Sequence, residues 1–134
     1  MLYHIFQGSV RDYRGSQNEI IYLVSTAEKI QAEKIPFVFT DRHAYLNHKV
    51  VYNSLHDLGQ LSWNIIKDDT WFQNYSALRK ELKQAEFLVF GHLPVNALLG
   101  IVCQNDQIAN FVRKVAASAN VSLPIAVRPD YYYT

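Results

Sequence analysis

The sequence predicts an α+β fold, a mixed β-sheet with flanking helices, on three observations. Short apolar and β-branched runs are typical of buried strands, and segments with helical periodicity separate them. The order of these segments is irregular and their connections vary in length, unlike the regular alternation of a doubly wound sheet. The chain has 134 residues, 49% of them apolar, which allows one sizeable core. We therefore expect residues 1–134 to form a single domain.

The N-terminal half contains two predicted strands. Residues 1–19 are interrupted by turn signals and are expected to be irregular. The run EIIYLVS (19–25) predicts the first strand, and AEKIQAEK (27–34) predicts a short helix after it. FVFT (37–40) predicts the second strand. Residues 41–61 mix polar and aromatic side chains and are expected to be loop with short helix, and residues 63–74 are expected to be a further connection rich in Asp and Asn.

The C-terminal half alternates helices and strands. The expected order is a helix at 75–84, strands at 86–91 and 100–104, a helix at 106–120 and a last, edge-type strand at 125–133. Asn105 directly precedes the clearest helix and is expected to cap it, because Asn accepts a bond from an N–H of the first turn. The apolar spacing of this helix predicts a core face made of Ile108, Phe111, Val112 and Val115.

Charge and cysteine content exclude several classes of protein. The net charge of +1 gives no strong electrostatic attraction to nucleic acid or to a membrane. The single Cys103 excludes an internal disulfide and a cysteine-based zinc site, and its apolar neighbours favour an inert core thiol. No apolar run reaches membrane-spanning length, and the N-terminus lacks the apolar region of a signal peptide. We expect a cytoplasmic protein with no membrane partner.

The chemistry is concentrated in residues 35–55 and 82–94. The chain has no Gly-rich phosphate loop, and His43 and His48 lack the spacing of a helical metal site, so no metal is expected. The strand 37–40 is followed by the polar run that contains His43. Glu86 stands at the start of another strand, where a carboxylate is rarely buried unless it is paired or has a chemical task.

Simpler interpretations stay open for these residues. Glu86 can be a solvated residue at the end of a strand, paired with Lys83. His43 can anchor its loop by a local hydrogen bond. The aromatic side chains of 71–75 can belong to the core.

Three stretches resemble the DarT-like DNA ADP-ribosyltransferases. IPFVFTDRHAYLNHKVVYNSL is similar to the family's Thr-Asp-x-His-Ala-Tyr segment. QAEFLVFGHLPVNALLGIVCQNDQIANFV resembles its Gln-Ala-Glu strand with the following His-x-Pro and Gly-Ile-x-Cys. MLYHIFQGSVRDYRGSQNEIIYLVS resembles its earlier Met-Leu-x-x-Ile segment and the next strand. The stretches follow in the same order and at similar spacing along nearly the whole chain.

The resemblance implies an activity and its residues. Family members transfer ADP-ribose from NAD to a thymine base of single-stranded DNA, and are usually toxins paired with a macrodomain antitoxin. Glu86 then matches the catalytic glutamate, and His43 matches a supporting histidine near the cleft. The loop before Glu86 is where the family recognises its substrate, with aromatic side chains on the bases and cations on the phosphates. The DNA-binding residues that follow from this are Trp71, Phe72, Tyr75, Arg79 and Lys83.

One departure from the family pattern limits the expected activity. Family members begin with a further segment that carries an NAD-binding strand and a catalytic arginine. We expect this chain to be the C-terminal portion of the domain, with a partial ADP-ribosyltransferase-like fold and no cofactor-binding residues that can be named. It would be a truncated or degenerate enzyme, weak or inactive alone, with NAD as co-substrate. The alternative is a non-enzymatic module that binds nucleic acid or protein, with self-association covering the apolar surface left exposed.

Overall fold

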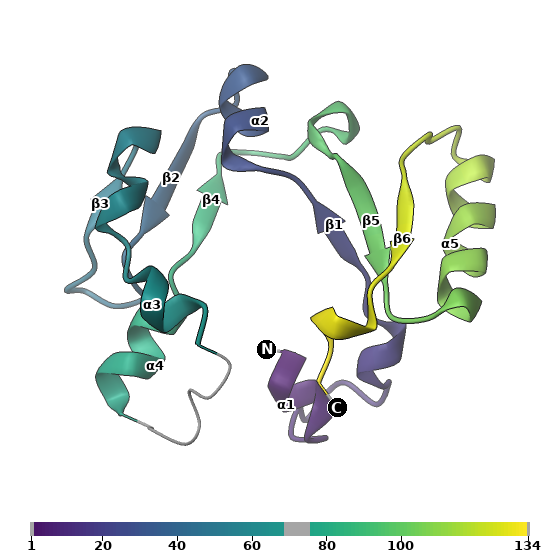
Figure 1. Cartoon of the computed structure of the whole chain (residues 1–134), viewed down its shortest axis with the longest axis horizontal. Coiled ribbons are helices and arrows are strands. Elements are labelled where there is room, and N and C mark those ends of the chain that lie inside the picture. The colour runs from purple at the N-terminus through teal and green to yellow at the C-terminus, as the bar shows by residue number, and fades with distance from the viewer. Residues whose placement is uncertain (1, 69–75, 134) are drawn as a thin grey trace. The chain divides into compact units, whose positions relative to one another are not determined.

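The computed structural model describes residues 2–68 and 76–133. They form two compact units, both drawn in Figure 1. Unit 1 contains Met1–Thr26 and Pro94–Thr134, and unit 2 contains Ala27–Leu93. The α+β class expected from the sequence is confirmed, because each unit combines a small sheet with helices. A single domain over the whole chain stays a prediction.

Unit 1 is built on a mixed three-stranded sheet. Its strands are β1 (Tyr22–Val24), β5 (Gly100–Cys103) and β6 (Ile125–Val127), in the order β1-β5-β6. β1 is antiparallel to β5, whereas β6 is parallel to it. Parallel neighbours need a crossover connection, and the helix α5 (Asp106–Ser118) supplies it. Figure 1 shows α5 lying alongside β5 and β6.

The helix α5 begins where the sequence predicts. The Asn105 side chain accepts a hydrogen bond from the N–H of Ile108 at 3.0 Å, which confirms the expected cap. The core of unit 1 lies between this helix and the sheet and consists of Ile101, Cys103, Ala109 and Val112. The prediction was wrong for Phe111 and Val115, which are 65% and 50% exposed. The helix therefore buries a narrower face than its apolar spacing indicates.

The ends of unit 1 differ from the sequence prediction. The expected irregular entry contains a short helix, α1 (Leu2–Phe6), and a 3-10 turn, η1 (Gln17–Glu19). A second 3-10 turn, η3 (Val95–Ala97), precedes β5. The last strand ends at Val127 and does not continue to residue 133 as expected. Pro129 follows it, which has no N–H for a ladder bond, and the chain turns into η4 (Pro129–Tyr131).

Tyr132 and Tyr133 are held against the N-terminal segment of unit 1 and are not strand residues. Tyr132 is 6% exposed and its hydroxyl donates to the carbonyl of Ile20 at 2.8 Å. The buried amide of Gln17 bonds to the backbone N–H and carbonyl of Tyr133. These bonds fix the chain end by tertiary contacts that local patterns do not predict.

Unit 2 contains an antiparallel sheet with short helices around it. Its strands are β2 (Phe37–Thr40), β3 (Val51–Tyr52) and β4 (Phe87–Val89), in the order β3-β2-β4. Its helical elements are α2 (Ala27–Ala32), the 3-10 helix η2 (Leu55–Gln60), α3 (Trp63–Ile66) and α4 (Ala77–Lys83). The strands β2 and β4 and the helices α2 and α4 confirm the predictions. The two-residue strand β3 had been expected as loop.

Stacked aromatic rings join the three strands of unit 2. Phe39, which is 1% exposed, lies between Tyr52 of β3 and Phe87 of β4, with ring centroids 5.2 and 6.1 Å away. Phe37 stacks on Phe87 at 4.9 Å. Alternate residues of a strand lie on one face, so Phe37 and Phe39 form a continuous apolar layer. This layer fixes the register of the strands that carry the candidate site.

Candidate active site

The backbone of Glu86 is held against the end of β2. The N–H of Thr40 donates to the Glu86 carbonyl at 2.9 Å, and the Thr40 hydroxyl accepts from the Glu86 N–H at 3.2 Å. Thr40 is 1% exposed, so these bonds are shielded from water. The Glu86 side chain itself is 35% exposed. The sheet thus fixes the backbone of Glu86, while its carboxylate stays partly exposed.

The imidazole of His43 meets this carboxylate. The Nδ1 atom of His43 lies 3.0 Å from Oε1 of Glu86, and the imidazole side chain is 45% exposed. At this distance the two groups interact directly through their polar atoms. Lys83, the partner considered for Glu86 from the sequence, donates instead to the carbonyls of Ile66 and Asp68 at 2.9 and 2.6 Å. His43 and Glu86, expected at one site, are therefore side by side.

The loop that carries His43 is anchored by Asp41. This carboxylate accepts two bonds from the Arg42 guanidinium at 2.8 and 2.9 Å and one from the Val50 N–H at 2.8 Å. Burial raises the pKa of the Asp41 carboxyl, but the bonds from Arg42 and Val50 outweigh that effect and the net pKa is below its ordinary value. The buried, ionised Asp41 closes the loop between β2 and β3.

Glu81 of α4 makes a second anchor for the same loop. Its carboxylate lies 3.1 Å from Nε2 of His48 and 3.7 Å from a guanidinium nitrogen of Arg42. Its carbonyl accepts from the N–H of His43 at 3.1 Å. The helix that precedes Glu86 and the loop that delivers His43 are thereby joined directly. Local spacing in the sequence does not predict these contacts of Glu81, because they join residues from different parts of the fold.

The predicted DNA-binding residues divide into two groups. Trp71, Phe72 and Tyr75 lie outside the described residues. Arg79 and Lys83 are on α4, where Arg79 pairs with Asp68 and Lys83 bonds to carbonyls at the end of α3. Both cations thus have partners within unit 2, and contact with a phosphate would have to compete with these bonds.

Tyr45 is an aromatic candidate that the predicted DNA-binding set does not include. Its side chain is 86% exposed, and its ring centroid lies 6.3 Å from that of His43. Exposed aromatic rings next to a polar site are typical platforms for unpaired bases. Tyr45 follows the predicted strand 37–40, and the sequence alone does not show that its ring stays in solvent.

The other chemical candidates are structural. Cys103 is fully buried, and burial raises the pKa of its thiol, which confirms the expected core role. Among residues 2–68 and 76–133, no three metal-ligating side chains come together. In the same part of the chain, no helix has the length and apolar character needed to cross a membrane.

Comparison with known proteins assigns this chain to a family. The family model described as "ssDNA thymidine ADP-ribosyltransferase, DarT" matches residues 1–133. The chain therefore belongs to the DarT family. A DNA ADP-ribosyl transferase of Thermus sp. (strain 2.9) is 35% identical over 99% of this chain, and one of Escherichia coli O127:H6 (strain E2348/69 / EPEC) is 32% identical over all of it.

Solved structures agree with the family assignment. The structure described as Thermus sp. 2.9 DarT in complex with NAD+ matches 98% of this chain with a TM-score of 0.92 and 33% identity. The chain covers 66% of that solved chain, and 63% and 62% of the Thermus and E. coli relatives. It thus spans slightly less than two thirds of the length of the relatives it matches.

Proposed function

We propose that this chain carries the acid and imidazole of an NAD-dependent DNA ADP-ribosyltransferase site. Glu86 is the catalytic carboxylate and His43 is its supporting residue. The observation that carries this proposal is the 3.0 Å contact between them, made by two partly exposed side chains, one directly before β4 and one in the loop after β2. Support comes from the relatives, one of which was solved with NAD+ and again with ADP-ribosylated single-stranded DNA.

The two side chains divide the work at the site. Bound NAD supplies the ribose carbon, whose bond to nicotinamide breaks as its bond to a thymine nitrogen forms, with the bonding pair leaving on the neutral nicotinamide. Glu86 stabilises the positive charge that develops on the ribose and accepts the proton that the thymine nitrogen loses. His43, whose Nδ1 lies 3.0 Å from Oε1 of Glu86, holds this carboxylate in one orientation.

The described residues offer groups suited to the ribose of NAD but not to its pyrophosphate. The exposed carboxylate is a suitable acceptor for ribose hydroxyls. The pyrophosphate needs cations or backbone N–H groups directed at it. The cation nearest in sequence to His43, Arg42, is already paired with Asp41 and Glu81. We therefore propose that residues 1–134 correspond to the C-terminal portion of the enzyme domain and that the chain alone is weakly active or inactive.

A transfer assay tests the assignment of Glu86. A single-stranded oligonucleotide with one thymine is incubated with NAD and the chain, and the modified strand is resolved by mass. Slow modification is expected, with at least a 100-fold loss in Glu86→Gln, since a transition-state electrostatic contact is worth about 10²–10³ in rate. Glu28→Gln, an exposed acid on α2, is the control and should keep the wild-type rate. Equal and measurable rates in Glu86→Gln and Glu28→Gln would overturn the role of Glu86.

The alternative function for the same fold is a non-enzymatic module that binds nucleic acid or protein. It predicts that no strand is modified and that NAD at millimolar concentration gives no heat in calorimetry. It also predicts that a thymine-containing strand binds equally well to wild type and Glu86→Gln. An enzyme that is only weak alone would still bind NAD saturably. The toxin role and the macrodomain antitoxin remain proposals that depend on observing the modification.

A further inference from the structure

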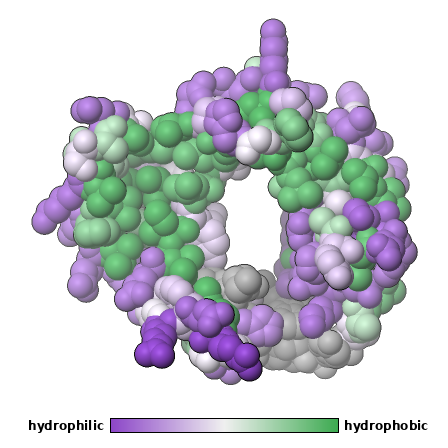
Figure 2. Space-filling model, turned by 180° about the vertical axis from the view of Figure 1, so that it is seen from behind, coloured by the Kyte–Doolittle hydropathy of each residue, from purple (hydrophilic) through white to green (hydrophobic). Residues whose placement is uncertain are grey.

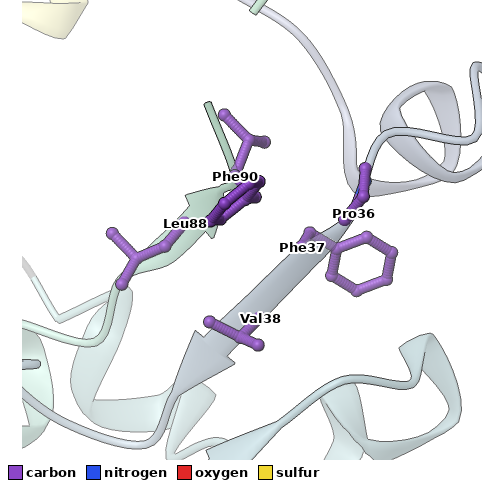
Figure 3. A pocket seen from close by; sticks show the side chains of 6 residues that line it. Pro36, Phe37, Val38, Leu88 and Phe90 are labelled. Carbon is purple, nitrogen blue, oxygen red and sulfur yellow. The ribbon is translucent and has the colours of Figure 1, made fainter. Parts of the chain in front are cut away.

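The candidate site lies at one end of the paired strands β2 and β4. The other end of this strand pair borders an apolar hollow of about 330 Å³ (Figure 3). It is lined by Pro36, Phe37, Val38, Leu88, Val89 and Phe90, whose side chains offer no charge or hydroxyl. The end at Thr40 and Glu86 continues instead into the polar loop of residues 41–50. The groups that hold this loop in place therefore affect the contact between His43 and Glu86.

The loop of residues 41–50 is closed at its base by its own bonds. The N–H of Asp41 donates to the Val50 carbonyl at 3.2 Å, and the N–H of Val50 donates to the Asp41 carboxylate at 2.8 Å. Within the loop, the N–H of Leu46 donates to the His43 carbonyl at 3.0 Å. These bonds define the shape of the loop, whereas its position beside the start of β4 depends on contacts with another element.

Glu81 of α4 supplies such contacts on both sides of His43. Its carbonyl accepts from the His43 N–H at 3.1 Å. Its carboxylate oxygen Oε2 lies 3.1 Å from Nε2 of His48 and 3.7 Å from a guanidinium nitrogen of Arg42. The same oxygen thus holds the residue directly before His43 and a residue near the end of the loop.

Glu81 is also tied to the backbone that leads to Glu86. The N–H of Gln84 donates to the Glu81 carbonyl at 3.1 Å, where α4 ends in a turn. Directly after this turn, the Glu86 N–H donates to the hydroxyl of the buried Thr40 at 3.2 Å. One short segment therefore contains the acid of the proposed site and the acid that holds the loop of its imidazole.

We propose that Glu81 is a positioning residue of this site. Its carboxylate holds the loop from both sides, so that the His43 imidazole stays 3.0 Å from the Glu86 carboxylate. Exposed ion pairs contribute little to the stability of a fold, and the side chains of Glu81 and His48 are 29% and 58% exposed. Loss of the carboxylate should therefore release the loop without unfolding unit 2. The value for catalysis rests on the proposed function, whereas the contact itself needs no nucleotide.

Two variants of Glu81 separate the role of its side chain from that of its backbone. Glu81→Ala removes the carboxylate and keeps the carbonyl that bonds to the His43 N–H. Glu81→Gln has the same size and keeps one oxygen that can accept from His48. Lys80→Ala, a change of the exposed neighbouring residue in the same helix, is the matched control.

NMR of the isotope-labelled chain without ligand measures the result in two ways. The first readout is the nuclear Overhauser effect between the ring protons of His43 and the side-chain protons of Glu86. The second is hydrogen exchange of the His43 backbone N–H. Glu81→Ala should lose most of the Overhauser effect and exchange roughly tenfold faster, because the loop then opens locally. Glu81→Gln should exchange within about twofold of wild type, and Lys80→Ala should match wild type in both readouts.

A second variant covers the case in which Glu81→Ala loses its near-ultraviolet circular dichroism. His48→Ala then replaces it, because this exposed side chain makes the same contact from the loop. It should weaken the Overhauser effect between His43 and Glu86 in the same direction.

Three outcomes would overturn the proposal. One is an Overhauser effect that is absent from wild type, or as strong in Glu81→Ala (or its replacement His48→Ala) as in wild type. Another is an equal loss in Lys80→Ala, which would indicate a general disturbance of α4. The third is a loss in Glu81→Gln as large as that in Glu81→Ala, which would exclude a role for the accepting oxygen. Neither readout uses NAD or DNA, so failure here is distinguishable from failure of the proposed activity.

Discussion

Thr40 holds together the two backbone segments that carry Glu86 and His43. Its hydroxyl accepts from the Glu86 N–H at 3.2 Å and donates to the Arg42 carbonyl at 2.6 Å. One buried group therefore fixes the residue before β4 and the start of the loop that contains His43. Removing it leaves two backbone groups without their partner.

Replacement of Thr40 should lower the free energy of unfolding. Thr40→Val keeps the shape but removes the hydroxyl, and should lower the free energy of unfolding by about 2 kcal/mol. Thr40→Ser keeps the hydroxyl and loses one methyl, for about 1 kcal/mol. Urea titration followed by tryptophan fluorescence reports on unit 2, because both tryptophans belong to its range. A Ser variant less stable than the Val variant would contradict the account.

Asp41 gives the loop a pH dependence. Its pKa in the folded chain is below the ordinary 3.8. Such a group stabilises the fold above its unfolded pKa and loses that contribution as the pH falls through the folded value. The difference in unfolding free energy between wild type and Asp41→Asn should be constant near neutral pH and shrink as the pH falls below 3.8. Urea titrations at several pH values measure it, and a difference independent of pH would contradict the prediction.

At this scale the sequence predicted the candidate residues but not their contacts. Two observations identified His43 and Glu86 as candidates. Each is a polar residue next to an apolar strand, and each matches a residue of the family. Their contact depends on the pairing of β2 with β4. Glu81 and His48, which contact each other, also lie in different parts of the chain, so local spacing does not predict their contact.

Elements with strong local patterns were predictable, and elements made by tertiary contacts were not. The strand β2 has a continuous apolar run and the helix α5 has a clear N-terminal cap, and both lie where the sequence predicts them. The strand β3 is two residues long and exists because it pairs with β2. The terminal tyrosines alternate like a strand, but Pro129 and the buried Tyr132 hydroxyl favour a turn.

The cap of α5 provides a test at the scale of one element. Asn105→Ala should lower the free energy of unfolding by about 1 kcal/mol, because the N–H of Ile108 loses its acceptor. Gln107→Ala, an exposed change in the first turn of the same helix, should cost less than about 0.5 kcal/mol. Thermal unfolding followed by circular dichroism compares the two. Equal losses would show that the cap does not stabilise α5.

Both units expose apolar side chains. In unit 1 these include Leu23 (59%), Leu99 (45%) and Phe111 (65%), and Figure 2 shows much green surface over this unit, at the left of the view. In unit 2 they include Leu88 and Phe90 at the edge of β4. Monomeric proteins rarely leave large apolar patches open. The exposed apolar side chains of each unit are available for contact with another polypeptide or with a second copy of this chain.

The most direct measurement is an NMR titration of the histidine side chains with NAD. His43 contacts Glu86, whereas His48 contacts Glu81, so the chain contains its own matched control. The account predicts that the His43 imidazole signals shift saturably with NAD while those of His48 stay in place, and that Glu86→Gln abolishes the shift. Signals of His43 that do not respond to NAD, or that respond equally in Glu86→Gln, would contradict a ribose-binding role for this carboxylate.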